Sequence, residues 1–88
     1  MKRTAKAGSA PASNGGDLGT ELRRRFSFTR AEANIALLLA EGLSYAETAA
    51  RLGVSYHTVH THVKAIHDKA KVKNNGRLLA LIAGIENA

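Results

Sequence analysis

The sequence of 88 residues predicts an all-α domain of four helices with a helix-turn-helix at its centre. Apolar residues recur at spacings of three and four from residue 28 onward, which is the period of helices buried on one side. No stretch alternates polar and apolar residues in the manner of a strand. Gly53 separates two helical stretches that each follow a serine, Ser44 and Ser55.

The first 20 residues are dominated by Gly, Ser, Ala and Asn and contain the only proline. Because they hold no apolar periodicity, burial cannot offset the entropy lost on ordering them. We expect residues 1–20 to form a disordered tail or linker and residues 21–88 to form one helix-turn-helix domain. At the start of this domain Leu22 and Phe26 are four residues apart, so one helical turn can dock on the core.

Three consecutive arginines, Arg23, Arg24 and Arg25, lie within that turn. They fit a contact to a polyanion and a solvated surface equally well.

The first full helix is predicted from Thr29 to about Glu41. Thr29 and Glu32 have the spacing of a capping box, in which each side chain bonds the backbone N–H of the other residue. Gly42 follows the last helical residue, as at many helix ends. We expect the buried side to consist of Ala31, Ile35, Ala36, Leu38, Leu39 and Ala40, with Phe28 packed back against them and Leu37 partly exposed.

The helix-turn-helix runs from Ser44 to Lys73. Ser44 and Glu47 repeat the capping-box spacing and open a helix from Tyr45 to Leu52, with Ala49 and Leu52 on its inner side. Gly53 suits the left-handed position that ends such a helix. We expect Val54 to return to the core before Ser55 caps the next helix.

The second helix of the motif is predicted over residues 56–71. Its buried stripe comprises Val59, Val63, Ile66 and Ala70. Its other side is polar and cationic and carries Tyr56, His57, His60, Thr61, Lys64 and His67. This pattern is typical of a helix-turn-helix whose second helix lies in the major groove of DNA.

The last helix is capped by Asn74 or Asn75 and runs to about Ile85. One apolar stripe comprises Leu78, Leu81, Ile82 and Ile85, and Leu79 with Ala83 forms a second, narrower stripe. Apolar residues on two sides indicate a partner, most simply a second copy of the chain, with Leu79, Ile82 and Ala83 as candidate dimer contacts. The alternative is that a small domain covers this helix more fully.

Composition narrows the class of function. Thirteen Lys and Arg against seven Asp and Glu give a net charge of +6, which favours a polyanionic partner. The sequence has no cysteine, no apolar run of membrane-spanning length and no signal peptide, so we expect a cytoplasmic protein without disulfides.

We expect neither enzymatic activity nor a cofactor. Glu32 and Glu47 are better explained as capping carboxylates than as an acid–base pair, and no glycine-rich phosphate loop is present. A metal site is not expected either, because zinc needs three or four converging ligands and His62 points to the opposite side of its helix from His60.

Residues 28–82 resemble the C-terminal DNA-binding domain of the LuxR/GerE-type bacterial transcription regulators. Positions that match the family pattern are Thr29, Glu32, Glu41-Gly42-Leu43-Ser44, Glu47, Ala49, Leu52-Gly53-Val54-Ser55, Thr58-Val59, His62, Ile66, Lys69, Val72-Lys73 and Leu78. The resemblance implies four helices and sequence-specific binding of double-stranded DNA in transcription regulation. It also implies that the third helix lies in the major groove and that the fourth often forms the dimer contact.

By position, the resemblance assigns base reading to His60, Thr61 and Lys64. It places Ser44, Tyr56, Thr58, His62 and Lys69 near backbone phosphates, and we add His57 from the outward side of the same helix. The sequence departs from the family at four positions. The family usually has lysine at His60, glycine at Lys71, arginine at Asn75 and a bulky aliphatic residue at Thr48.

Two other functions remain open at this point. A module similar to region 4 of sigma factors shares the motif, and RNA polymerase is a further candidate partner. A helical protein-interaction module would use its basic face for solubility only. Strong salt dependence of duplex binding distinguishes a DNA-binding domain from the latter.

Overall fold

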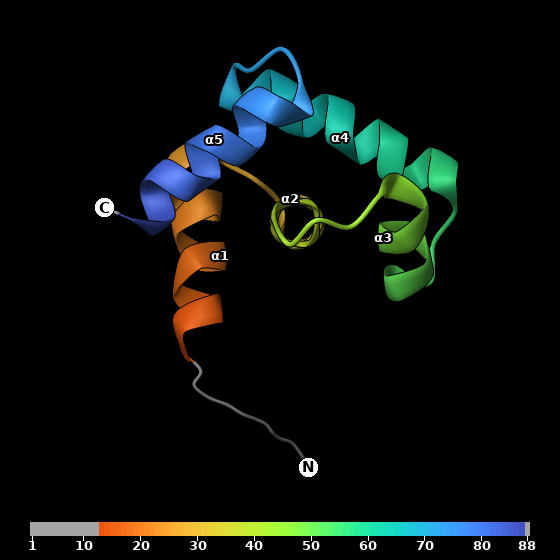
Figure 1. The fold of residues 1–88 in the computed structure, drawn as a ribbon, viewed down its shortest axis with the longest axis horizontal. Helices are drawn as coiled ribbons and strands as arrows, with labels where there is room; N and C mark the ends of the chain where they lie inside the picture. The colour runs from red at the N-terminus through yellow and green to blue at the C-terminus, as the bar shows by residue number, and fades with distance from the viewer. Residues whose placement is uncertain (1–12, 88) are drawn as a thin grey trace.

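The computed structural model describes the backbone of residues 13–87 and the side chains of residues 18–87, and within them every regular element is a helix. The five helices are α1 (Ser13–Phe26), α2 (Arg30–Ala40), α3 (Tyr45–Leu52), α4 (Tyr56–Ala70) and α5 (Asn75–Glu86). Helix α2 lies at the centre and packs against each of the other four (Figure 1). The predicted all-α fold with a central helix-turn-helix, α3 and α4, is confirmed. The described residues form five helices rather than the predicted four, because residues 13–26 form a full helix and not a single turn.

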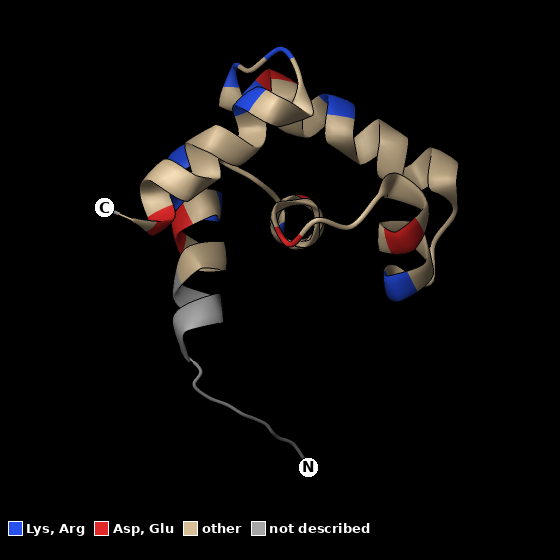
Figure 2. Cartoon of the chain, viewed as in Figure 1, with Lys and Arg blue, Asp and Glu red and all other residues tan. Residues whose placement is uncertain are grey.

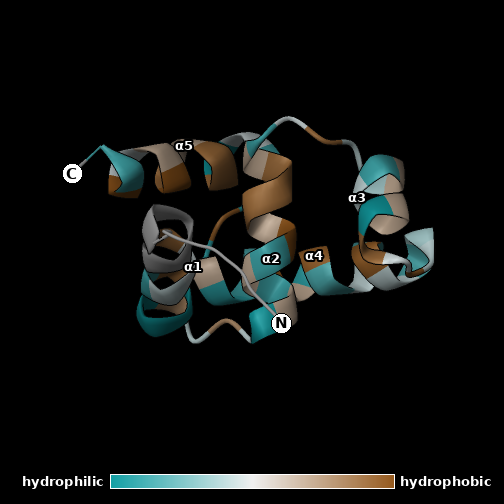
Figure 3. Cartoon of the chain, turned by 90° about the horizontal axis from the view of Figure 1, so that it is seen from below, coloured by the Kyte–Doolittle hydropathy of each residue, from teal (hydrophilic) through white to brown (hydrophobic). Residues whose placement is uncertain are grey.

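One hydrophobic core joins the five helices. Figure 3 shows that hydrophobic residues concentrate on α2 and α5, whereas α3 is largely hydrophilic. The buried apolar side chains are Leu22, Phe28, Ala33, Ile35, Ala36, Leu39, Ala49, Val59, Val63, Ile66, Ala70, Leu78 and Ile82. The predicted buried stripe of α4 is therefore confirmed at all four positions. One complete face of α4 is buried in the core and holds this helix in place.

The helix starts follow the predicted capping. In the first box, Thr29 Oγ1 accepts from Glu32 N–H at 3.1 Å and the Glu32 carboxylate accepts from Thr29 N–H at 2.9 Å. Ser44 and Glu47 form the second box at 3.0 and 2.8 Å. Asn74, rather than Asn75, caps α5 by accepting from Arg77 N–H at 2.9 Å.

Helix α1 begins earlier than the sequence indicated. Residues 13–20 are helical, so the predicted disordered tail extends too far along the chain and its boundary at residue 20 falls inside α1; residues 1–12 lie outside the described residues. Leu18 and Phe26 pack against the core on either side of the fully buried Leu22. These three residues are spaced by four, and their burial explains why a glycine-rich segment adopts a helix.

Leu52 and Val54 are not in the core, contrary to the prediction. They are 36% and 41% exposed and border a hollow of about 220 Å³ between α2 and the turn of the motif. Leu52 shares a helical face with the buried Thr48 and Ala49, but it is the last residue of α3, where this hollow separates it from α2. Ala31 and Ala40 of α2 are also exposed, so its buried side is narrower than predicted.

Four residues that follow helices have positive φ angles: Ser27, Gly42, Gly53 and Lys71. Gly53 ends α3 with φ 71°, as predicted, and Lys71 ends α4 with φ 58°. Lys71 occupies a position where the family usually has glycine, and a side chain there carries a steric cost of about 1 kcal/mol. No helix in residues 13–87 is long and apolar enough to cross a membrane.

Candidate nucleic-acid interface

The outward face of α4 lies opposite its buried stripe. His57, His60, Thr61 and Lys64 are all exposed on this face, whereas Thr58 and His62 are half-buried at its edge. The structure thus brings the three predicted base-reading residues together on one solvent-facing surface. Asp68 follows Lys64 by one helical turn and is also exposed. This carboxylate was not singled out from the sequence, and it places a negative charge one turn beyond Lys64.

Positive charge is uneven along α4. Basic residues gather on its second half and on the connection to α5 (Figure 2), which together contain Lys64, Lys69, Lys71 and Lys73. The first two turns, from Tyr56 to Val63, carry histidines and hydroxyl groups but no lysine or arginine. The first half of the outward face of α4 is therefore neutral and polar, and its second half carries Lys64 followed by Asp68.

The start of α4 is fixed by Ser55. Its hydroxyl accepts from Thr58 N–H at 3.0 Å and lies 2.9 Å from Thr58 Oγ1. The backbone N–H and the hydroxyl group of Thr58 both interact with Ser55 within the chain. The resulting cap orients the first turn of α4, which contains Tyr56 and His57.

Tyr45 connects the reading face to α5. Its hydroxyl accepts from Asn75 Nδ2 at 3.0 Å, and Asn75 Oδ1 lies 2.7 Å from His67 Nε2. The Tyr45 ring lies 6.0 Å from the Tyr56 ring and makes an edge contact with the His60 ring at 6.2 Å. Tyr45 was not predicted as a site residue. Asn75, where the family usually has arginine, was the available sign that this region differs.

Lys69 forms an ion pair inside the chain. Its ammonium group donates to Glu32 Oε1 at 2.7 Å and to the Ser27 carbonyl at 3.2 Å. Burial raises the pKa of Glu32, but the hydrogen bonds from Lys69 and Thr29 and the Lys69 charge outweigh it and hold the pKa below its ordinary value of 4.5. The Lys69 side chain is 34% exposed, and it links α4 to α2. The structure gives this residue a role in the fold that the sequence did not indicate.

The candidate dimer contacts do not share one exposed surface. Ile82 is 1% exposed and belongs to the core of its own chain, so it cannot contact a second copy in this conformation. Leu79 is half-buried against the core, and only Ala83 is exposed. The core covers α5 more fully than two apolar stripes suggested, so its outer face consists mainly of small residues, Gly76, Ala80, Ala83 and Gly84.

The histidines do not converge. Within the described residues, no group of three or more His, Cys, Asp or Glu side chains has the geometry to hold a metal ion. His67 instead bonds Asn75, and His60 contacts Tyr45.

A helix-turn-helix with a fully buried inner stripe and a polar, partly cationic outer face defines a DNA-binding domain. A family model described as "Bacterial regulatory proteins, luxR family" matches residues 26–82, more than half of the chain. The chain therefore belongs to the LuxR family of bacterial regulatory proteins, whose helix-turn-helix binds DNA in transcription regulation. Comparison with curated proteins and with solved structures gave no match.

Proposed function

We propose that this chain binds double-stranded DNA sequence-specifically, with α4 in the major groove, as a bacterial transcription regulator. The observation that carries the proposal is the division of α4 into two faces. Val59, Val63 and Ile66 are at most 2% exposed, whereas the opposite face presents His60, Thr61 and Lys64 to solvent. A helix fixed in this way can enter a groove without losing its packing.

The chemistry of the outward face suits base edges. Lys64 donates to guanine O6 or N7, Thr61 offers a hydroxyl group and a methyl group for thymine, and His60 donates or accepts. Each good contact of this kind discriminates between bases by about 1–3 kcal/mol. Through its ring contact with His60, Tyr45 restricts where that imidazole lies. We therefore assign Tyr45 a positioning role.

We assign contacts with DNA backbone phosphates to the residues around this face. Ser44, Tyr56 and His57 are exposed, and Thr58 and His62 are half-buried beside them. Lys69 is placed in the same group, although its ammonium group also holds Glu32. Contacts of this kind supply most of the affinity and little sequence information.

Dimerisation on DNA is proposed through the outer face of α5. Ala83 and its small neighbours Gly76, Ala80 and Gly84 are exposed there, so a second helix can approach closely. Leu79 borders this surface. RNA polymerase remains a further candidate partner of the bound regulator.

The test is fluorescence anisotropy of the chain with a duplex at several salt concentrations, followed by selection of a preferred site. About six phosphate contacts give a log–log salt slope near −5. The double variant His60→Ala, Lys64→Ala should weaken binding to the selected site by at least about tenfold, or 1.4 kcal/mol. The same titration counts chains per duplex, and two are expected on an inverted repeat.

Arg24→Ala is the matched control, because it removes one positive charge from α1, away from α4. If the control weakens binding as much as the α4 variant, the contact is general charge attraction and the assignment of α4 is wrong. Duplex binding that is absent at low salt contradicts the proposed function as a whole and favours a protein-interaction module.

A further inference from the structure

The three arginines of α1 differ in their surroundings. Arg24 and Arg25 both donate to the Glu21 carboxylate, and these hydrogen bonds lower the pKa of Glu21. Arg23 lies on another side of the helix and faces α2. The arginine run is therefore two surfaces: a pair that shares one carboxylate, and a single guanidinium that faces a neighbouring helix.

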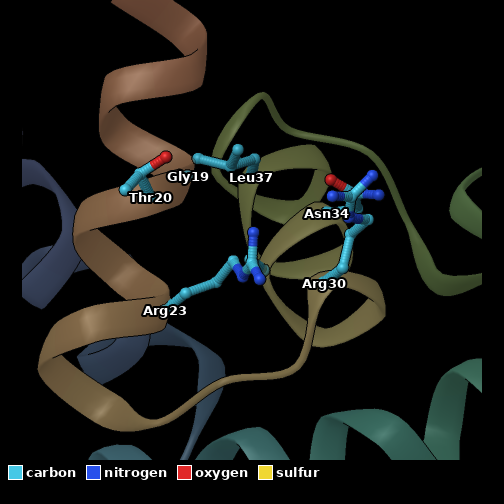
Figure 4. A pocket seen from close by; sticks show the side chains of 7 residues that line it. Gly19, Thr20, Arg23, Arg30, Asn34 and Leu37 are labelled. Carbon is cyan, nitrogen blue, oxygen red and sulfur yellow. The ribbon is translucent and has the colours of Figure 1, made fainter.

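Arg23 lines a hollow of about 280 Å³ between α1 and α2. Figure 4 shows Arg23 reaching from α1 toward α2, where Arg30 lies alongside Asn34. The hollow is also lined by Gly19, Thr20 and Leu37. Among the residues whose side chains are described, no acidic group pairs with Arg23 or Arg30. Two guanidinium groups thus line one hollow, and none of the carboxylates described from residue 18 onward pairs with them.

This combination of groups selects an anion with an apolar stem. Guanidinium groups bind planar oxyanions through paired N–H donors, and the Thr20 hydroxyl and Asn34 amide add further donors. Leu37 supplies an apolar wall that a methylene chain can contact. A glutamate or aspartate side chain has both parts.

The hollow opens on the side of α2 that faces away from α4. Arg30, Asn34 and Leu37 follow the spacing of one helical face. Glu32 and Ile35 lie on the opposite face; Glu32 bonds Lys69 of α4, and Ile35 lines a second hollow with Thr58 and His62 of α4, which Asn34 also borders. The reading face of α4 points outward beyond these contacts. Neither Arg23 nor Arg30 borders this second hollow, so the two arginines and the outward face of α4 lie on different sides of α2.

From this geometry we propose that the α1–α2 hollow is a docking site for an acidic segment of a partner protein, whose carboxylate is held by Arg23 and Arg30 while α4 holds DNA. The choice of a protein over a nucleic acid rests on the proposed function of α4. The acidic-ligand chemistry of the hollow does not depend on it.

The experiment is an NMR titration of the full chain with a short oligoglutamate peptide, alone and with a saturating duplex. Saturable shifts are expected at the backbone amides of Thr20 and Asn34 and at the side-chain Nε–H of Arg23 and Arg30. An oligoglutamine peptide of equal length should give none. The variant Arg23→Gln, Arg30→Gln should weaken peptide binding by at least about tenfold.

Arg24→Gln, Arg25→Gln is the matched control, because it removes the same amount of charge, from α1 alone, and leaves the hollow intact. Equal weakening by both double variants overturns the proposal, since only net charge then matters. Displacement of the peptide by the duplex also overturns it, because the arginines then contact nucleic acid. The proposal is also overturned if the peptide causes no saturable shift at the residues of the hollow.

The same titration distinguishes failure of the proposed DNA binding from failure of the proposed docking site. If the chain binds no duplex but the peptide still shifts Thr20 and Asn34 in an arginine-dependent manner, the acidic-ligand site stands and the role of α4 falls. If duplex binding is normal and the peptide does not bind, the role of α4 stands and the acidic-ligand site falls.

Discussion

Thr48 contains a buried polar atom that has no hydrogen-bond partner among the described residues. Thr48 lies in α3 and is 0% exposed, and the atom without a partner is its Oγ1. The family usually has a bulky aliphatic side chain at this position. A buried hydroxyl without a partner costs about 1–3 kcal/mol. Thr48→Val replaces the hydroxyl with a methyl group of similar size, so we expect the free energy of unfolding to rise by about 1 kcal/mol in urea denaturation.

Thr61→Val makes the same chemical change at an exposed position of a helix. Its effect on unfolding should stay within about 0.5 kcal/mol, because no desolvated group is involved. A Thr48→Val protein that is no more stable than the Thr61→Val protein would show that Oγ1 has a partner in solution.

At the scale of single residues, the sequence indicated local contacts well and distant ones poorly. Both capping boxes were predicted because their partners are three residues apart, so spacing alone defines them. The hydrogen bond from Asn75 to Tyr45 joins residues 30 apart, and the ion pair of Lys69 with Glu32 joins residues 37 apart. No spacing rule predicts such pairs, because they depend on how the helices pack.

Among the helices, α2 and α4 are joined by the Glu32–Lys69 pair, which makes the stability of the fold depend on pH. The folded chain holds the pKa of Glu32 below 4.5, so its ionised form stabilises the fold above about pH 4.5. This contribution is lost as the pH falls from 4.5 through the lower folded-state pKa. Chemical denaturation at a series of acidic pH values should show a loss of stability that Glu32→Gln makes less steep.

Lys69→Gln completes this test from the other partner. It removes the hydrogen bond and the charge but leaves Glu32 buried, so the pKa of Glu32 should rise and the loss of stability should begin at a higher pH. At neutral pH we expect a cost of about 1–2 kcal/mol, because Lys69 is partly exposed and water screens the pair in part. Identical pH profiles for the wild type and both variants would contradict the assignment.

Helix α1 lies before the matched family region except for its last residue, Phe26, yet it contributes to the core. Leu22 is fully buried, so Leu22→Ala should lower the free energy of unfolding by about 2–4 kcal/mol in thermal or urea denaturation. Leu52→Ala makes the same change at a residue that is 36% exposed and should cost much less. Equal costs at the two positions would mean that α1 is not docked as described.

The elements were predicted most accurately where apolar periodicity is strong. The four buried positions of α4 follow directly from their spacing. The start of α1 was missed because its glycines outweighed the leucine spacing in the prediction. The exposure of Leu52 was missed because a helical face says nothing about where the neighbouring helix ends.

For the whole molecule, the net charge of +6 indicated a polyanionic partner but not how the charge is arranged. In the structure, Lys64 lies on α4, Lys71 and Lys73 lie on its connection to α5, and Arg23 with Arg30 forms a separate basic region beside α2. Arrangement in space, rather than total charge, is what allows one small domain to engage two anionic molecules at once.

The way in which α1 is seated has a mechanical consequence. Its 14 residues form a rod about 21 Å long. Leu18, Leu22 and Phe26 anchor the rod in the core, where α1 crosses α2 (Figure 1), and the Phe26 ring lies 5.3 Å from that of Phe28. Because α1 packs on α2 and the Glu32–Lys69 pair joins α2 to α4, we expect a force applied at the Ser13 end to reach α4 through α2.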